Sequence, residues 1–508
     1  MNRSALGPNN FARLLLDTAE HAGDSPALVE PGRTTSYQEL AQRAWSIATD
    51  LVRRGLRPGD RAAVFLPRGA EGAAAFFGVL AAGGVVVIVN ESLRPRQIEH
   101  ILAHSGARFL LTSTDLLSRL PRLLESGVPW LDVSAVGHVG EMGPVERIGP
   151  DIAQIIYTSG STGLPKGVTL SHANLWAGTD AVVAYLGIST EDRIASLLPF
   201  SFDYGLNQLA CSVATGATLV VERSPVPERI VWALRQHEVS ILPAVPPLWL
   251  QLLSVTSFRG QPIESLRIMT NTGGRLPSEA VRQLRLCQPR ADLVLMYGLT
   301  EAFRSTFLAP SKVDKKPGSI GGPIPGAEIL VVRDDLTPCE PGEIGELVHR
   351  GPTVAMGYWN DPEASAQVYR PNPLRPAGAP QAERVAFSGD LVYQDNEGDL
   401  YFVGRRDQMI KSLGYRVSPE EVVEVLYASG EVVEAAVTSE PDEVRGAQIV
   451  AYVVLRPEGR LDRLTAFSRR EMPRYMQPGR IEVRSSLPRT HSGKHDVAAA
   501  SGGQDDPS

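Results

Sequence analysis

Cysteine is scarce in this sequence, and the three cysteines that it contains, Cys211, Cys287 and Cys339, are widely spaced. An odd number of cysteines without regular spacing indicates neither a disulfide framework nor a cysteine-rich metal centre, so we expect buried thiols in a reducing compartment. A strong excess of one charge is lacking too, because the formal net charge is −7 over 508 residues. This balance gives no reason to propose nucleic acid or an anionic membrane as a general partner.

Long uninterrupted apolar runs are also missing. The run Leu14–Leu16 near the N-terminus is followed by acidic residues and is too short for a secretory signal. The longer run Ala73–Val89 is interrupted by Gly83 and Gly84. Because glycine ends helices and β-branched residues follow it here, this run predicts a helix and then a buried strand, not a membrane span. These absences together predict a cytoplasmic protein.

What the first 300 residues do contain is an alternation of helical segments and short apolar strands. The chain is too long for one hydrophobic core, so we expect more than one domain. Apolar runs of strand length recur at residues 61–67, 84–90, 107–113, 217–222, 239–245, 265–271 and 292–298. Strands that alternate with helices are typical of parallel α/β layers. Most of these runs end at polar or glycine residues, which is where ligands gather in open α/β sheets.

The pattern changes after residue 316, where short strands are separated by proline and glycine. We expect a large N-terminal core of layered α/β sheets at residues 1–406, which includes a small β-rich subdomain at about 317–404. A small α+β C-terminal domain is expected at residues 407–498, followed by a disordered tail at 499–508.

Three further expectations concern the last third of the chain. Residues 370–384 are rich in proline and alanine and predict an exposed loop. A helix is expected at Pro419–Ala428, and strands are expected at residues 432–438 and 448–455. No internal repeat is visible.

The segment Thr158–Gly167, TSGSTGLPKG, combines small hydroxyl residues and glycines with one lysine. Glycine permits backbone conformations in which successive amides point at one anion, while hydroxyls add donors and Lys166 adds a positive charge. The segment therefore predicts a phosphate-binding loop. It is not a Walker A loop, because Leu164 and Pro165 precede the lysine and a glycine follows it. The residues after it, GVTLSHANLW, predict the end of a strand and the start of a helix.

Four further motifs follow in order along the chain: MYGLTE (Met296–Glu301), FSGDLV (Phe387–Val392), GRRDQMIKSLGYRVSPEEVVEVL (Gly404–Leu426) and LPRTHSGKHD (Leu487–Asp496). With the glycine-rich loop, this ordered set resembles the AMP-forming adenylating superfamily of acyl-CoA synthetases, peptide-synthetase adenylation domains and luciferases. The resemblance covers nearly the whole chain. It is strongest to stand-alone amino-acid adenylation enzymes that load carrier proteins, and it implies an AMP-forming ligase that uses ATP and Mg²⁺.

The resemblance assigns roles on the nucleotide side of the site. In the chemistry it implies, a carboxylate attacks the α-phosphorus of ATP, so the site must supply positive charge and hold two anions in line. Thr300 is expected at the α-phosphate, Glu301 at Mg²⁺, Tyr297 at the adenine face and Asp390 at both ribose hydroxyls, with Arg405 nearby. The loop residues expected at the β- and γ-phosphates are Thr158, Ser159, Gly160, Ser161, Thr162, Gly163 and Lys166. The glycines expected to lie against the nucleotide are Gly273, Gly274 and Gly298.

The resemblance also implies two half-reactions in one site. Lys494 would bridge the substrate carboxylate and the α-phosphate in the first, and a thiol would accept the acyl group in the second. Between them the C-terminal domain would rotate about a hinge at Asp407. After rotation the loop that contains Lys411 and Gly414 would enter the site, where Gly414 leaves room for a pantetheine arm.

The stretch LLPFSFDYGLNQL, residues 197–209, indicates which kind of acid is activated. In amino-acid-activating relatives an aspartate in this motif pairs with the α-ammonium of the substrate, and Asp203 occupies that place. A purely structural alternative is that Asp203 caps a helix that begins at Tyr204. By motif position, the residues expected to line the acid pocket are Tyr204, Asn207, Ala244, Thr270, Thr272, Met296, Arg304 and Ser305.

The size of this pocket is expected to be small, because Tyr204 and Met296 are bulky. A small side chain such as that of alanine, glycine or proline is favoured. Arg304 does not suit a neutral side chain. It either pairs with an acidic side chain, as of aspartate or a methylated relative, or points into solvent, and we rank solvent first because arginines at loop edges are commonly exposed.

The thiol acceptor is either coenzyme A or the phosphopantetheine of a carrier protein. No condensation or carrier domain is visible in the sequence, which favours a discrete carrier protein in natural-product assembly. The segment Arg456–Arg489 is rich in arginine and is either a docking face for an acidic carrier or a solvated surface. Three hypotheses follow: an amino acid–carrier protein ligase, an AMP-forming acyl-CoA synthetase, and a non-catalytic binding protein with the same fold. Only the last has no use for Lys166, Glu301, Asp390 and Lys494 together.

Overall fold

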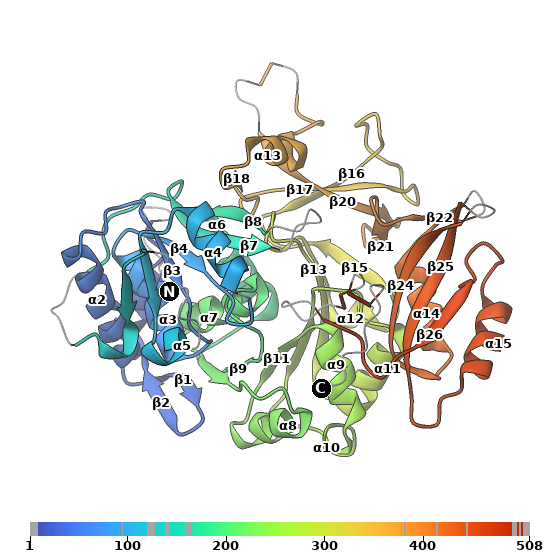
Figure 1. The fold of residues 1–508 in the computed structure, drawn as a ribbon, viewed down its shortest axis with the longest axis horizontal. Helices are drawn as coiled ribbons and strands as arrows, with labels where there is room; N and C mark the ends of the chain where they lie inside the picture. Colours follow the sequence, from blue (N-terminus) through green and yellow to red (C-terminus); the bar gives the residue numbers. More distant parts are fainter. Residues whose placement is uncertain are drawn as a thin grey trace.

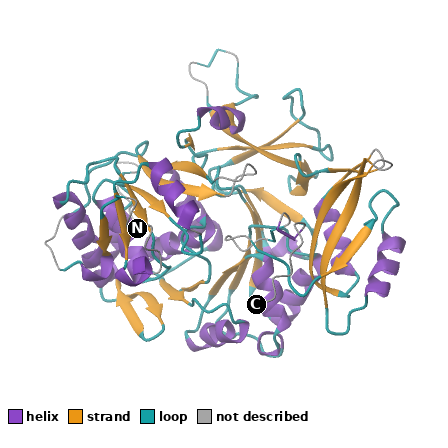
Figure 2. Cartoon of the chain, viewed as in Figure 1, coloured by secondary structure: helices purple, strands orange, loops and turns teal. Residues whose placement is uncertain are grey.

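The computed structural model describes residues 9–93, 95–118, 127–137, 143–158, 165–376, 378–379, 383–412, 415–442, 446–489, 495–496 and 499–500. The chain forms two large sheets with helices on their faces, and a smaller sheet near the C-terminus (Figure 1). Figure 2 shows the strands of the three sheets in orange and the helices that cover them in purple. The expected fold class, mixed α/β with a small C-terminal unit, is confirmed.

The first sheet has seven strands in the order β18-β8-β7-β4-β3-β5-β6. Its central strands run parallel, and β8 and β18 join antiparallel. Its strands are β3 (Arg61–Val64), β4 (Val85–Ile88), β5 (Phe109–Thr112), β6 (Trp130–Asp132), β7 (Ile152–Thr158), β8 (Lys166–Ser171) and β18 (Gly357–Tyr358).

The second sheet has fourteen strands in the order β16-β17-β20-β21-β15-β14-β13-β12-β11-β9-β10-β1-β2, with β19 paired to β20. Strands β13, β12, β11, β9, β10 and β1 are parallel, and all the pairings beyond them are antiparallel. The parallel half and its edge consist of β1 (Pro26–Glu30), β2 (Arg33–Ser36), β9 (Arg193–Ser196), β10 (Thr218–Val221), β11 (Ile241–Ala244), β12 (Ile268–Asn271) and β13 (Asp292–Tyr297). The antiparallel half consists of β14 (Thr306–Leu308), β15 (Ser319–Pro323), β16 (Glu328–Val332), β17 (Gly345–Arg350), β19 (Tyr369–Pro371), β20 (Arg384–Gln394) and β21 (Leu400–Arg405).

The expected β-rich segment after residue 316 is thus present, and its strands continue the large sheet through the pairing of β14 with β15. Part of the expected exposed loop at residues 370–384 belongs to strands, because β19 pairs with the start of β20 at Arg384. The described residues between the two strands are exposed or half-buried.

Alternation of side chains along the strands explains the layered arrangement. In β13, Leu293 and Leu295 pack in one hydrophobic cluster with helices of the outer face, whereas Val294 and Met296 pack in the other cluster on the inner face. Helices α2 (Tyr37–Arg53), α3 (Ala70–Ala81) and α7 (Asp203–Thr215) supply the inner cluster, which lies between the two large sheets. Helices α8 (Pro227–Gln236), α9 (Pro246–Ser254) and α11 (Ser278–Cys287) supply the outer one. The remaining helices of this part are α1 (Arg13–Ala22), α4 (Pro95–Ser105), α5 (Thr114–Ser118), α6 (His172–Leu186), α10 (Thr256–Arg259), α12 (Pro310–Val313) and α13 (Pro362–Val368).

The apolar run Ala73–Val89 folds as predicted. Helix α3 is buried along almost its whole length, Gly83 has a φ of 78°, and β4 follows with four buried residues. A left-handed φ of this kind is easily adopted only by glycine, which explains where the helix ends. Along the described part of the chain, no helix is both long and apolar enough to cross a bilayer.

The third sheet has five strands near the C-terminus and is covered by two helices. Its elements are β22 (Ile410–Ser412), β23 (Tyr415–Val417), α14 (Pro419–Ala428), β24 (Val432–Asp442), β25 (Gly446–Leu455), α15 (Leu461–Glu471) and β26 (Arg480–Val483). The predicted helix at 419–428 and the two predicted strands are confirmed. Ala500 is buried against this unit with Ala436 and Tyr452, and residues 501–508 of the expected tail lie outside the described residues.

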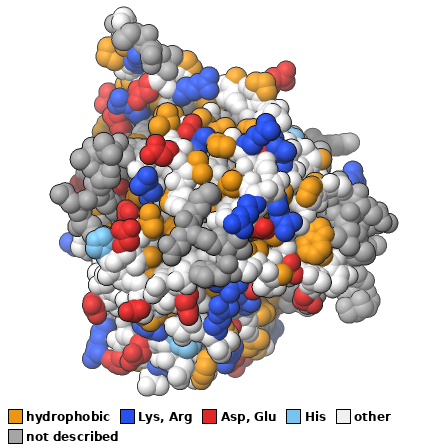
Figure 3. All heavy atoms as spheres, turned by 90° about the vertical axis from the view of Figure 1, so that its left-hand side faces the viewer, with side chains coloured by type: hydrophobic (Ala, Val, Ile, Leu, Met, Phe, Trp, Pro, Cys, Tyr) orange, Lys and Arg blue, Asp and Glu red, His pale blue; other side chains and the backbone are white. Residues whose placement is uncertain are grey.

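On the face turned toward the viewer in Figure 3, basic and acidic side chains are interspersed with scattered hydrophobic ones. This face therefore carries no large field of one charge, in agreement with the small net charge.

Candidate active site

One hairpin loop, residues 298–305 between β13 and β14, contains candidate residues for both reactants. Tyr297 and Thr306 pair at the base of the loop, and the Ser305 N–H donates to the Tyr297 carbonyl at 3.1 Å. A Cβ at Gly298 would lie 2.7 Å from the Phe303 carbonyl oxygen, so only glycine lets the loop close this tightly. Phe303 has a φ of 57°, which is uncommon for a non-glycine residue.

Glu301, in this loop, is held by the short strand β18. The Tyr358 hydroxyl donates to Glu301 Oε1 at 2.7 Å, and the Ala355 N–H donates to the Glu301 carbonyl at 2.9 Å. Burial, and then the neighbouring Glu301, raise the pKa of Tyr358 above its ordinary value, so its hydroxyl keeps the proton that it donates. Glu301 is half-buried and presents a hard oxygen donor of the kind that suits Mg²⁺.

The same tyrosine contacts Lys166, at the end of the loop that is expected to bind phosphate. Lys166 Nζ lies 5.5 Å from the centroid of the Tyr358 ring. Thr158 and Lys166 are paired across β7 and β8, so the two ends of the loop are fixed side by side. As predicted, β8 is followed at once by α6, whose N-terminus has a capping box formed by Ser171 and Asn174. The expected phosphate ligands Ser159, Gly160, Ser161, Thr162 and Gly163 lie outside the described residues.

Asp390 and Tyr297 meet at the junction of the two halves of the large sheet. The Tyr297 hydroxyl donates to Asp390 Oδ2, and Arg405 Nη1 lies 3.4 Å from Asp390 Oδ1. Burial, and then Asp390, raise the pKa of Tyr297 well above its ordinary value. The structure thus brings together the residues expected at the adenine and the ribose. Asp390 is 5% exposed and its carboxylate is oriented by both neighbours.

The glycines expected beside adenine follow β12. Gly273 has a φ of 80°, and Asn271 Nδ2 donates to the Gly274 carbonyl at 3.1 Å. This loop also contacts the C-terminal unit, because the Ser278 N–H donates to Glu424 Oε1 at 3.1 Å. The third sheet therefore sits beside the nucleotide side of the site.

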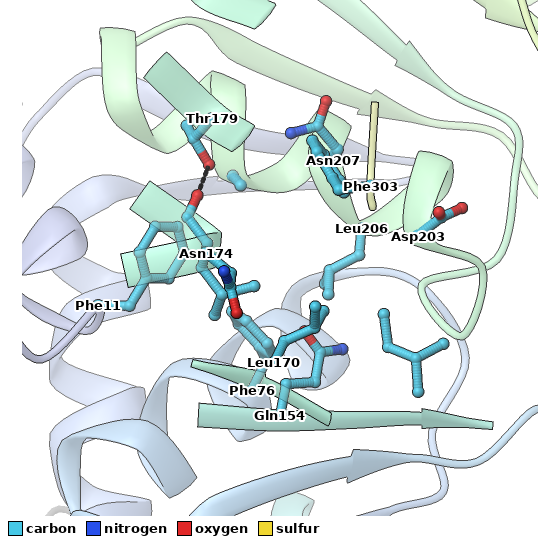
Figure 4. Close-up of a pocket in the computed structure, with 13 residues that line it drawn as sticks. Phe11, Phe76, Gln154, Leu170, Asn174, Thr179, Asp203, Leu206, Asn207 and Phe303 are labelled. Carbon is cyan, nitrogen blue, oxygen red and sulfur yellow. Dashed lines mark hydrogen bonds between the residues drawn. The ribbon is translucent and has the colours of Figure 1, made fainter. Parts of the chain in front are cut away.

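Helix α7 contains Asp203 and lies between the two large sheets. The helix begins at Asp203 and not at Tyr204, its N-cap residue Phe202 makes no side-chain cap, and Asp203 Oδ1 accepts from the Tyr204 N–H at 2.7 Å. Asp203 is 6% exposed and borders a cavity with Leu206 and Asn207 from the same helix (Figure 4). The other side chains of this cavity come mainly from β7, β8, α6 and the hairpin loop: Gln154, Ile156, Leu170, Asn174, Leu175, Thr179 and Phe303.

A second cavity lies on the adjacent stripe of α7, against the large sheet. It brings together five of the residues expected in the acid pocket: Tyr204, Asn207, Thr270, Met296 and Arg304. The Tyr204 hydroxyl contacts Thr270 Oγ1 at 2.5 Å, and the Tyr185 hydroxyl lies 2.9 Å from the Met296 sulfur. Asn207 borders both cavities.

Arg304 is buried, and the expectation that it points into solvent is wrong. Only 2% of the residue is exposed, and its guanidinium lies 4.6 Å from the centroid of the Tyr204 ring and 5.0 Å from that of Phe303. The reason is the left-handed turn at Phe303, which folds the end of the loop back toward α7.

Three other expected pocket residues are buried but do not border the two cavities. Ala244 and Thr272 lie at the ends of β11 and β12. Ser305 Oγ contacts His349 Nδ1 at 2.9 Å, and His349 Nε2 contacts Thr353 Oγ1 at 3.0 Å. Burial lowers the pKa of His349 to about 4, so the ring is neutral and links the hairpin loop to β17.

The residues expected to act during domain rotation are only partly described. Lys494, Gly414 and the side chain of Lys411 lie outside the described residues. Asp407 is exposed and follows β21, where its Oδ1 lies 3.3 Å from Arg405 Nε. It stands between the large sheet and the third sheet, as a hinge requires.

Sequence reasoning did not find Tyr358, Tyr185 or His349. Each lies far in the chain from the motif residue that it contacts, and Tyr358 is 57 residues from Glu301. The sequence Gly357-Tyr358-Trp359 was a weak signal of a buried contact, because two large aromatic side chains in a turn-rich stretch are expected to pack against other parts of the protein.

Comparison with known proteins identifies the class. The family model described as AMP-binding enzyme matches residues 15–359, and the model of the AMP-binding enzyme C-terminal domain matches residues 421–494. The chain belongs to the AMP-binding enzyme family, and it is an adenylate-forming ligase.

Two curated relatives are similar over nearly the whole chain. Novobiocin biosynthesis protein H of Streptomyces niveus is 32% identical over 502 residues, which cover 96% of this chain and 82% of that protein. A long-chain-fatty-acid–CoA ligase of Bacillus subtilis is 29% identical over 528 residues, covering 95% and 92%.

Solved structures agree with these relatives. The o-succinylbenzoate CoA synthetase of Bacillus subtilis bound to its acyl-adenylate has a TM-score of 0.84 at 28% identity, covering 97% of this chain and 98% of that one. The same enzyme bound to ATP and magnesium has a TM-score of 0.83 at 29% identity, covering 96% and 98%. An anthranilate CoA ligase bound to anthranoyl-AMP has a TM-score of 0.88 at 25% identity, covering 99% and 98%.

Proposed function

We propose that this enzyme activates a small amino acid as its adenylate and transfers the aminoacyl group to the phosphopantetheine thiol of a stand-alone carrier protein. The observation that carries the choice of an amino acid is Asp203. Its carboxylate is buried at the start of α7 and borders a cavity next to Asn207. A carboxylate held at such a place is costly unless a ligand cation or hydrogen bonds compensate it, and an α-ammonium is the cation that an amino acid provides.

ATP and Mg²⁺ are the cofactors of this proposal, and the residues present suit them. ATP supplies the adenylyl group and a pyrophosphate leaving group. Glu301 would hold the metal, with its orientation set by Tyr358, and Asp390 would accept from the ribose hydroxyls, with its orientation set by Tyr297 and Arg405. Lys166 and the loop before it would hold the terminal phosphates.

The proposed mechanism uses the chain's own charges to bring two anions together. Lys494 would neutralise the charge that builds between the acid and the α-phosphate, and removal of one such donor typically costs about 10²–10³ in rate. Rotation at Asp407 would then exchange Lys494 for the loop of Lys411 and Gly414. The arginine-rich segment Arg456–Arg489 of the C-terminal unit would attract an acidic carrier protein.

The test is ATP–pyrophosphate exchange across the amino acids, with purified enzyme and Mg²⁺. Exchange with one or a few small amino acids supports the proposal, and Asp203→Ala should remove it. Strong exchange with fatty or aryl acids and none with amino acids would refute the role of Asp203.

The alternative is an acyl-CoA synthetase of the AMP-forming type. Two of the relatives and structures above are CoA ligases by name, and a third is a CoA synthetase, which favours coenzyme A as acceptor. The acceptors are distinguished by supplying the activated acid with either coenzyme A or a phosphopantetheinylated carrier protein. The rate of thioester formation with each acceptor is measured by mass spectrometry, and the faster reaction identifies the acceptor.

A further inference from the structure

Arg304 is a buried cation without a carboxylate partner. Among the described residues no carboxylate oxygen lies within 4.0 Å of its guanidinium, although the residue is 2% exposed. Nη1 makes a long hydrogen bond of 3.4 Å to the Phe303 carbonyl, whereas Nε and Nη2 have no hydrogen-bond partner in the described part of the chain.

The aromatic neighbours stabilise this charge only in part. The guanidinium stacks on Tyr204 and Phe303, and its charge opposes the rise that burial causes in the pKa of Tyr185. A cation–π contact offsets only part of the free energy that removal of a charge from water costs. The stacked rings orient the guanidinium, and among the described residues Nε and Nη2 stay without a hydrogen-bond partner.

The two unpaired nitrogens form one edge of the guanidinium, and this is the edge that other arginines of the molecule give to carboxylates. Arg267 donates from Nε and Nη2 to the two oxygens of Asp192 at 2.7 and 2.6 Å. Arg282 does the same with Glu279 at 2.8 and 2.6 Å, and Arg460 with Asp462 at 3.0 and 2.7 Å. This planar edge matches a carboxylate in bidentate geometry.

Arg304 lies in the wall of the expected acid pocket. Its side chain borders the cavity that contains Tyr204, Asn207, Thr270 and Met296. Asn207 also borders the cavity of Asp203. The cavity of Asp203 and the cavity of Arg304 therefore adjoin the same residue of α7. A ligand that meets both would carry a cation at one end and an anion at the other, in addition to the carboxylate that reacts.

We propose that the acid activated by this enzyme carries a second anionic group, a side-chain carboxylate that binds the Nε–Nη2 edge of Arg304. This inference rests on the proposed function and narrows it to a small acidic amino acid. The bulk of Tyr204 and Met296 favours an aspartate-sized molecule over a longer one. Arg304 is thus a specificity-determining residue, and the neutral side chain that the sequence favoured is replaced by an anionic one.

The first test compares isosteric pairs with the wild-type enzyme: aspartate with asparagine, and glutamate with glutamine, with alanine and succinate as further probes. Loss of a hydrogen bond to a charged group costs up to about 3 kcal/mol, so kcat/KM in ATP–pyrophosphate exchange should favour aspartate over asparagine by about 100-fold. Aspartate should exceed glutamate. Equal or better exchange with asparagine or alanine overturns the inference.

The second test changes the arginine. Arg304→Gln should reduce the preference for aspartate over asparagine to less than about tenfold, because the bidentate donor is lost. Arg304→Lys should retain part of the preference through its single charge. The matched control is Arg282→Gln, which removes an exposed arginine on α11 and should leave the preference unchanged. An unchanged preference in Arg304→Gln overturns the inference.

The outcomes separate the two proposals. Exchange with neutral amino acids but no preference for aspartate contradicts the role of Arg304 and leaves amino acid activation standing. Exchange with succinate as strong as with aspartate supports Arg304 and contradicts the ammonium site at Asp203. Exchange with no acid at all contradicts the proposed function itself. If Arg304→Gln does not fold, as judged by its thermal transition, the wild-type pairs still decide.

Discussion

The two ends of the hairpin loop 298–305 differ in how their charges are partnered. Glu301 accepts from Tyr358 of β18, and its backbone carbonyl accepts from the N–H of Ala355, just before that strand. Arg304, three residues on, has aromatic neighbours but no carboxylate among the described residues. The first end is organised by contacts within the protein, whereas we propose that the second is completed by a carboxylate of the substrate.

The groups expected to bind the nucleotide and the group proposed to select the acid therefore differ in how they are held. Groups expected at the nucleotide, such as Asp390 and Glu301, have their orientation set by hydrogen bonds within the protein. Preorganised groups of this kind serve the same cofactor whatever the acid. An unsatisfied buried donor discriminates between acids, since a ligand without the matching group leaves it unpaired.

The largest effect is expected from Lys494→Ala, which acts on the step that both ends serve. Adenylate formation should fall by at least about 10²–10³, because the charge between two anions is no longer neutralised. Thioester formation from a supplied aminoacyl-adenylate should be retained. Lys315→Ala, a change of an exposed lysine, is the control. Equal loss of both half-reactions would contradict the two-state scheme.

The next effect is expected from Asp390→Asn, which tests the nucleotide end alone. The KM for ATP should rise by roughly 10- to 100-fold, because hydrogen bonds to a charged acceptor are replaced by weaker ones. The KM for the amino acid should not change. Asp334→Asn, on the exposed surface, is the control. An equal rise in both KM values would show that the two ends are not independent.

A smaller effect is expected from Tyr358→Phe, which removes the donor to Glu301 and keeps the ring beside Lys166. The Mg²⁺ concentration for half-maximal exchange should rise by about 3- to 10-fold, since one hydrogen bond contributes about 1 kcal/mol. The control is Tyr369→Phe: Tyr369 is 4% exposed, its hydroxyl has no hydrogen-bond partner among the described residues, and its ring centroid lies 5.8 Å from that of Tyr358. If the Mg²⁺ concentration for half-maximal exchange rises equally in Tyr369→Phe and Tyr358→Phe, a positioning role for Tyr358 is excluded.

The smallest effect concerns His349, behind the Arg304 end. Because its pKa is about 4 in the folded chain and about 6.5 when unfolded, the unfolded state binds the proton first as pH falls. The stability that neutral His349 contributes is therefore complete above pH 6.5 and is lost between pH 6.5 and 4, on the order of 1–3 kcal/mol. His349→Asn should flatten the dependence of the free energy of unfolding on pH, measured by urea denaturation. His172 is buried with a similarly lowered pKa of about 4, so part of the slope should remain.

Much of the architecture could be predicted, and the reasons are local. Helix α14 and the break at Gly83 follow from apolar periodicity and from glycine's freedom at positive φ. The continuation of the large sheet through β14 and β15 could not be predicted, because strand pairing joins segments whose sequences carry no mark of their partner.

The candidate site divides in the same way. Its motif residues are separated by up to hundreds of positions, yet their types and order were enough to predict an adenylate-forming ligase, and the family match confirms it. The burial of Arg304 was predicted wrongly, because exposure depends on the left-handed turn at Phe303 and on the face of α7 that the loop meets.

The amino-acid sequence by itself therefore determined the class of chemistry, since a glycine-rich loop with a lysine, a Gly-Asp motif and a late Gly-Lys motif form an ordered set that resembles one superfamily. Only the tertiary structure decided which charges have partners. A charge's cost depends on what surrounds it within a few ångströms, and in this fold those neighbours come from distant parts of the chain.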